Sequence, residues 1–228
     1  MTTFEPIGII TRSQQVFDDV KKAIFEGKFK PGEPLRELQL AREFQVSQST
    51  IREALIQLEM GGYVVRTPHR GTSVVDLSDE EITERLELRY HLEELAYSLA
   101  SEKMTEADYK ELQGYLEEIN EAVKKSSYPE LVKADLAFHR YIWEKSGNRS
   151  LVRTLEQITV PLLAYLGIKR HSKLHDISAV LSPHEKLIEA IKSGNPKLIR
   201  ESIADDANRS YKQYIPKRKK GFRNIGRF

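Results

Sequence analysis

Apolar residues recur at steps of three and four positions along most of the chain between residues 80 and 211. That period matches the α-helix, and strand-like alternation is absent from this part of the sequence. Short breaks rich in Ser, Gly and Asn interrupt the pattern, and such short turns join antiparallel neighbours. We therefore expect a bundle whose helices cover residues 80–102, 106–125, 128–145, 150–171, 183–192 and 196–211.

Composition limits the size and setting of the fold. The chain has 228 residues, 39% of them hydrophobic, which is enough for two small domains. It has no cysteine, which excludes disulfides and thiolate zinc sites. No apolar run reaches the ~18 residues of a membrane span, and no signal-peptide pattern opens the chain. We expect a cytoplasmic protein without a membrane partner.

Charge divides the chain into three parts. Acids and bases balance over residues 1–77, acids exceed bases over residues 78–210, and the last eighteen residues hold seven Lys/Arg and no acid. With the periodicity, this predicts domains at residues 1–76 and 77–213 and a basic tail at 214–228. We interpret the tail as a solvated terminus, with a supplementary phosphate contact as the alternative.

The N-terminal part contains three short helical patterns followed by two strand-like runs. The second helix is expected at residues 37–44, and the third begins at Ser47, an N-cap residue, or at the capping box that opens with Thr50. Gly61 and Gly62 end it, and a β-hairpin follows. The predicted fold is therefore mainly α: a winged helix-turn-helix, then an all-α antiparallel bundle of six or seven helices.

A winged helix-turn-helix suggests a DNA-contacting surface. The N-terminal residues of its third helix reach base edges in the major groove, where Gln pairs with adenine and Arg with guanine. Basic residues in the hairpin are placed to follow the backbone or the minor groove. The predicted DNA-binding residues are Gln48, Ser49, Thr50, Arg52, Arg66, His69 and Arg70.

A second group of polar residues falls inside the predicted bundle. Asp135 and His139 are four residues apart and so share a helix face. His184 opens a later helix, and Asp206 lies in the last one. Carboxylates and imidazoles from three helices can hold zinc, nickel or manganese, and a surface salt link is the alternative interpretation.

The head resembles the DNA-binding domain of the GntR family of bacterial transcription regulators. The run from Gly27 to Val74 carries G-K-F-K-P-G-E-P-L-R-E, L-A-R-E-F-Q-V-S, I-R-E-A-L-I-Q-L-E, G-Y-V and R-G-T-S-V in the family's order and spacing. Leu38, Gln48 and Thr50 depart from common family residues, whereas Arg52 keeps the usual base-reading arginine. The resemblance implies DNA binding with an operator of its own.

The bundle resembles the FCD domain of the FadR subfamily. The matching motifs are E-L-R-x-x-L-E at 87–93, D-L-A-F-H at 135–139, S-G-N at 146–148 and I-A-D-D at 203–206. The resemblance implies a metal held by Asp135, His139 and His184, with Asp206 replacing a usual histidine, which favours manganese, iron or zinc. It also implies an organic-acid effector near Arg89 and Asn148. The alternative for Arg89 is a salt bridge to Glu93.

These inferences predict a dimeric, ligand-responsive regulator that represses by binding a near-palindromic operator. A small carboxylate metabolite would change operator affinity through the bundle. Two alternatives stay open. One is a metal-dependent helical-bundle enzyme, which lacks the paired Glu-x-x-His motifs of di-metal bundles. The other is a helical interaction protein whose head has lost DNA binding.

Overall fold

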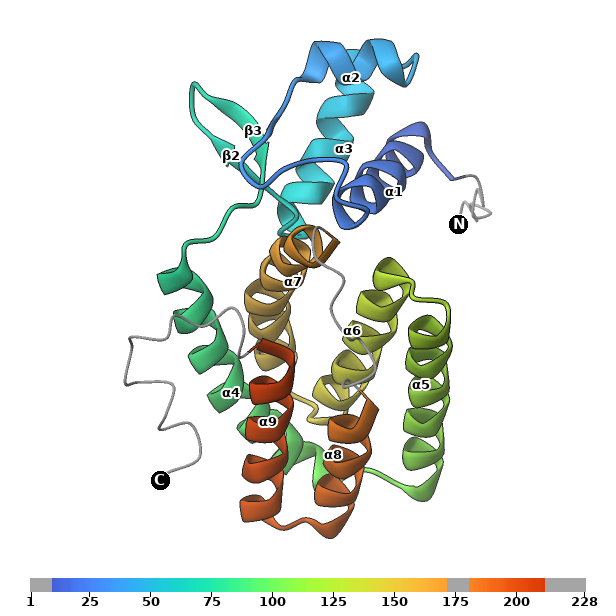
Figure 1. Ribbon diagram of the computed structural model, residues 1–228, viewed down its shortest axis with the longest axis vertical. Helices are drawn as coiled ribbons and strands as arrows, with labels where there is room; N and C mark the ends of the chain where they lie inside the picture. Colours follow the sequence, from blue (N-terminus) through green and yellow to red (C-terminus); the bar gives the residue numbers. More distant parts are fainter. Residues whose placement is uncertain (1–9, 172–180, 212–228) are drawn as a thin grey trace, which may run out of the picture.

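The computed structural model describes residues 10–171 and 181–211, and the predicted tail at 214–228 lies outside them. Within the described residues a small head sits above a helical bundle (Figure 1). The head contains α1 (Arg12–Phe25), β1 (Pro34–Leu35), α2 (Glu37–Glu43), α3 (Gln48–Met60), β2 (Val64–Thr67) and β3 (Gly71–Val74). The predicted winged helix-turn-helix is confirmed.

The third helix starts at one of the two positions that its sequence predicts. Ser47 is the N-cap, and its hydroxyl accepts a hydrogen bond from the Thr50 amide at 3.2 Å, so the helix begins here and not at the later capping box. Gln45, with φ of 55°, makes the tight turn from α2. One face of α3 is buried in the head: Ile51, Ala54, Leu55 and Leu58.

The wing contains one strand more than the sequence predicted. The sheet order is β1-β3-β2, all antiparallel. In β1, Pro34 lies opposite Ser73 and Leu35 opposite Thr72. Two residues beginning with proline are too few to show alternation, so this strand depends on its pairing with β3. It ties the start of α2 to the wing.

The bundle consists of α4 (Asp79–Ser101), α5 (Glu106–Lys124), α6 (Tyr128–Lys145), α7 (Arg149–His171), α8 (Leu181–Ser193) and α9 (Pro196–Tyr211). Capping boxes start α4 at Ser78 and α5 at Thr105. The predicted start of α8 at Pro183 is two residues late, because the first turn of a helix tolerates proline. None of the helices in the described ranges is long and apolar enough to cross a membrane.

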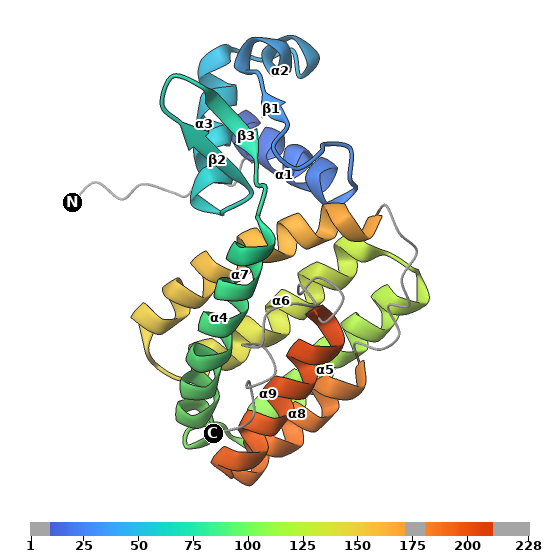
Figure 2. The same ribbon diagram turned by 60° about the vertical axis from the view of Figure 1, so that its left-hand side comes forward.

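The head rests on α7, which runs across the top of the bundle (Figure 2). Helix α1 contacts α7, and Gly62, two residues beyond the end of α3, lies directly against Pro161 of α7. The same helix packs on α4 and α6 below. Buried apolar residues of the head and bundle form one continuous cluster, so α7 connects the head to the bundle interior.

Candidate metal centre and nucleic-acid interface

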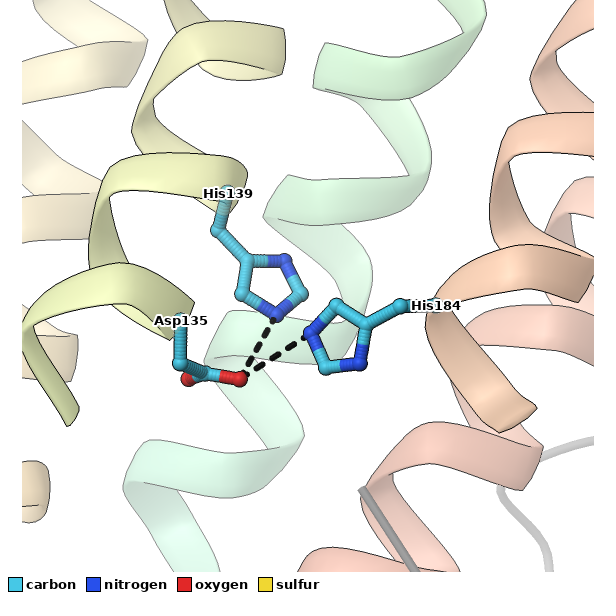
Figure 3. Close-up of side chains that lie close together, drawn as sticks. All are labelled: Asp135, His139 and His184. Carbon is cyan, nitrogen blue, oxygen red and sulfur yellow. Dashed lines mark ion pairs between the residues drawn. The ribbon is translucent and has the colours of Figure 1, made fainter. Parts of the chain in front are cut away.

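Helices α6 and α8 bring three predicted ligands together inside the bundle (Figure 3). Nε2 of His184 lies 3.0 Å from Oδ1 of Asp135, and Nε2 of His139 lies 3.8 Å from the same oxygen. One possible ligand atom from each residue falls within 4.8 Å of the others. Asp206 of α9 adds a fourth group, because its Oδ2 lies 4.0 Å from Nε2 of His139.

Burial and charge set the protonation of this cluster. His139 and His184 are 2% and 1% exposed. Burial, with Arg89 nearby, lowers the pKa of His139 well below its usual value, so the ring is neutral. Burial opposes ionisation of Asp135, yet the hydrogen bond from His184 and the nearby positive charge of Arg89 hold the pKa of Asp135 below its usual value. The neutral imidazole of His139 and the ionised carboxylate of Asp135 are forms that bind a divalent metal, and the imidazole of His184 lies beside them, so these residues fit an ion.

Behind His139, three residues of α4 form a buried polar chain. Nδ1 of His139 lies 2.6 Å from the Tyr97 hydroxyl, which also donates a hydrogen bond to Oε1 of Glu93 at 3.0 Å. Nε of Arg89 donates to the same Glu93 oxygen at 2.9 Å. When Tyr97 donates to Glu93, its oxygen is available to accept from Nδ1–H of His139. That arrangement leaves the Nε2 lone pair facing Asp135 and Asp206.

The buried chain bears on both interpretations of Arg89, as a salt-bridge partner of Glu93 and as a residue near the effector site. The salt bridge to Glu93 is present, with both side chains almost fully buried, and Arg89 is near enough to the ligand cluster to lower the pKa of His139. Sequence reasoning missed Tyr97 as a site residue. The spacing of Arg89, Glu93 and Tyr97, four residues apart along α4, is the signal that could have found it.

Asn148 is placed differently from the other predicted site residues. It is exposed at the start of α7, where its Oδ1 accepts a hydrogen bond from the Leu151 amide at 3.1 Å. This is a helix-capping contact. In this structure Asn148 therefore acts as a helix cap, and the function proposed below uses Arg89.

The predicted DNA-binding residues lie on the outer face of the head. Gln48, Ser49 and Arg52 are exposed on α3, and Thr50 is half-buried beside the Ser47 cap. Arg66, on β2, lies close to Arg52 because both face the carboxylate of Glu37. His69, with φ of 63°, and Arg70 form the exposed tip of the wing.

Comparisons with known proteins agree with this architecture. Residues 12–74 match the model for bacterial regulatory proteins of the gntR family, and residues 84–208 match the FCD domain. The chain is 31% identical to the HTH-type transcriptional regulator YdhC of Bacillus subtilis (strain 168) over 190 residues, covering 83% of this chain and 84% of the relative. The chain belongs to the GntR family of bacterial regulatory proteins.

Two further relatives span most of this GntR-family chain. The gluconate operon transcriptional repressor of Bacillus licheniformis is 27% identical over 190 residues, which cover 81% of this chain and 77% of that protein. The structure of E. coli McbR/YncC has the same fold, with a TM-score of 0.74 and 24% identity over 90% of this chain and all of that one. GntR-family proteins are DNA-binding transcription regulators and not enzymes, so the bundle-enzyme interpretation is wrong.

Proposed function

We propose that this GntR-family regulator is a repressor whose affinity for its operator changes when a small carboxylic acid binds in the FCD domain beside a divalent metal. The observation that carries the proposal is the buried group of Asp135, His139 and His184, with Asp206 next to it. Buried ionisable residues are costly unless they are paired or hold a ligand. The name of the gluconate operon repressor, given to a relative, supports repression as the mode of control.

Manganese, iron or zinc suits this donor set, which pairs two carboxylates with two imidazoles. When bound, the ion supplies a positive charge and coordination positions that a carboxylate can occupy. Arg89 adds a second positive charge close to His139. An organic acid is therefore the chemical class of effector that this site would attract.

The route from site to DNA runs through α7. This helix packs on α4 and α6, which carry Arg89 and His139, and it supports the head at Pro161. An effector that binds one arrangement of these helices better than another shifts the heads accordingly, with a coupling of typically ~1–3 kcal/mol.

A dimer would place two heads on the half-sites of a near-palindromic operator. Leu88 and Leu95, seven residues apart on α4, are 54% and 48% exposed. Two large apolar side chains on one face of a helix favour association with a second copy of the chain. We include this homodimer in the proposal.

Thermal unfolding of chelator-treated protein tests the metal and effector parts together. Each divalent metal is added alone and then with small carboxylic acids, because a ligand that binds only the folded state raises the Tm by mass action. We expect a rise with metal and a further rise with one class of acid. Metal content is measured in parallel for His139→Ala and for the control His91→Ala, which changes an exposed histidine of α4.

The His139→Ala protein should lose its metal, and the His91→Ala protein should keep it. Unchanged metal content in His139→Ala would contradict the site assignment. A rise with an acid but without any metal would instead point to Arg89 as the effector's main partner.

A further inference from the structure

The carboxylate of Glu37 contacts side chains from two other elements of the head. Its Oε2 accepts hydrogen bonds from Nε2 of Gln48 and from Nη2 of Arg52, both at 2.8 Å. Its Oε1 accepts a third from Nε of Arg52 at 3.3 Å and lies 4.0 Å from Nη2 of Arg66. One residue of α2 therefore gathers three of the predicted DNA-binding residues, two from α3 and one from β2.

Exposure distinguishes the centre of this group from its rim. The Glu37 side chain is 22% exposed, whereas those of Arg52 and Arg66 are 51% and 43% exposed. The hydrogen bond from Arg52 outweighs partial burial and lowers the pKa of Glu37, so the carboxylate is ionised at neutral pH. A negative charge sits beneath the basic side chains on a surface that would face polyanionic DNA.

An ordinary surface ion pair does not describe this arrangement well. Such a pair joins two mobile side chains and contributes little, whereas Glu37 holds the side-on edge of Arg52 through both Nε and Nη2. The outer N–H groups of Nη1 and Nη2 stay available. Those are groups that can pair with O6 and N7 of guanine.

We propose that Glu37 is a specificity-determining positioning residue for DNA reading. It fixes Arg52 and Gln48 in the orientation that meets base edges. Its negative charge lowers the affinity of the head for DNA sites at which these side chains can contact only phosphates. The inference rests on the proposed operator binding. It adds that discrimination between bases depends on a residue that itself offers no donor to DNA.

The charge of Glu37 has two opposite effects. On a matching site, oriented donors make base contacts without first losing side-chain freedom, which raises affinity. On random DNA, the carboxylate repels phosphates and holds Arg52 back from them, which lowers affinity. Neutralising Glu37 should therefore lower affinity for the matching site and raise affinity for random DNA, so that the ratio of the two changes more than either affinity alone.

Selection from a library of randomised duplexes supplies the probe. Wild-type protein is used to select a preferred duplex, and its affinity and that of a random duplex are then measured with Glu37→Gln, Arg52→Ala and the double variant. Glu43→Gln is the matched control: it removes the same charge from the same helix, and its side-chain partner is Gln39 of α2 at 2.9 Å.

We expect Glu37→Gln to lower discrimination about tenfold at the base pair that Arg52→Ala also affects. The double variant should lose no more there than Arg52→Ala alone. Glu43→Gln should shift both affinities in parallel, because it changes charge without touching Arg52. Circular dichroism of each variant establishes that the head is folded.

Two results would overturn the inference: Glu37→Gln discriminating like wild type, or Glu37→Gln and Glu43→Gln changing the ratio equally. A wild-type protein that selects no preferred duplex would overturn the proposed operator binding, and the role of Glu37 with it. The failures are therefore distinguishable.

Discussion

Gly62, just beyond the end of α3, lies directly against the ring of Pro161 in the middle of α7. A Cβ atom on Gly62 would come within 2.6 Å of Cγ and 2.9 Å of Cδ of that proline. Gly62 also has φ of 75°, a backbone conformation that other residues adopt only with strain. The contact joins the turn that follows α3, the helix that carries Arg52, to α7, which packs on α4 and α6 of the bundle.

Replacing Gly62 with alanine should destabilise the protein by more than its backbone conformation explains. The control is Gly71→Ala, where φ is 86° and nothing lies within 4 Å of the new Cβ. Both changes carry the left-handed backbone cost of roughly 1–2 kcal/mol. Gly62→Ala should cost about 1–3 kcal/mol more, because the rigid proline ring cannot rotate away. Urea unfolding measures both free energies.

A double-mutant cycle with Pro161→Ala tests the contact itself. That change removes Cγ and Cδ, the ring atoms closest to the added Cβ, so the double variant should recover at least about 1 kcal/mol relative to additivity. Additive effects would show that Gly62 and Pro161 are not coupled and would remove the proposed route through α7.

Arg52→Ala should weaken operator binding by ~1–3 kcal/mol and relax discrimination at one base pair. Arg42→Ala, which removes an exposed arginine of α2, should affect operator and random duplex alike. Equal operator affinity of Arg52→Ala and wild type would show that this position does not read DNA.

Binding of the wild-type protein to random duplex should fall steeply as the salt concentration rises. If the protein shows no such salt-dependent binding, the alternative of an interaction protein whose head has lost DNA binding is favoured.

Tyr97→Phe should lower metal affinity by roughly 10–100-fold while leaving the fold intact. The change removes only the hydroxyl that lies between Nδ1 of His139 and Glu93, so the imidazole loses the group that orients it. Tyr109→Phe, in α5, removes a hydroxyl outside the site. Calorimetric titration with metal compares the metal affinities of the Tyr97→Phe and Tyr109→Phe proteins. Wild-type affinity in Tyr97→Phe would mean that packing alone orients His139.

Asp108→Asn should destabilise the bundle by about 1–3 kcal/mol at neutral pH. Oδ1 of Asp108 accepts from Lys145 at 2.5 Å and from the Tyr141 hydroxyl at 2.8 Å, while Oδ2 closes the capping box with Thr105. The bond from Lys145 is the main reason that the pKa of Asp108 is depressed in the folded protein.

The sign of the pH dependence follows from that depression. Above the unfolded-state pKa of about 4 the contribution of Asp108 is complete, and it is lost as the pH falls below that value towards the folded-state pKa. Urea unfolding should therefore show a constant difference between wild type and Asp108→Asn from pH 6 to 8 and a shrinking one below about pH 4. An equal difference in unfolding free energy at neutral pH and below about pH 4 would show that the effect of Asp108→Asn comes from altered packing and not from lost charge.

Local sequence rules predicted the elements well because the forces that start and stop a helix act over a few residues. Ser47, the predicted N-cap, does cap α3, and Ser78 and Thr105, which were not predicted as caps, cap α4 and α5 in the same way. The apolar residues that recur at helical steps in α3 are the ones that this helix buries. Strand β1 was not predicted, because its two residues form a strand only by pairing with β3.

The candidate site was predictable only in part, for the same reason. Asp135 and His139 are neighbours on one helix, so their spacing predicts that they share a face. The chain by itself determined the helices, their caps and the residue types available for metal and DNA. Tertiary structure decided which of those residues meet: Asp206 with His139, Glu37 with Arg52, and Gly62 with Pro161. The two residues of each pair belong to different elements, and the packing of those elements sets the distance between the two side chains.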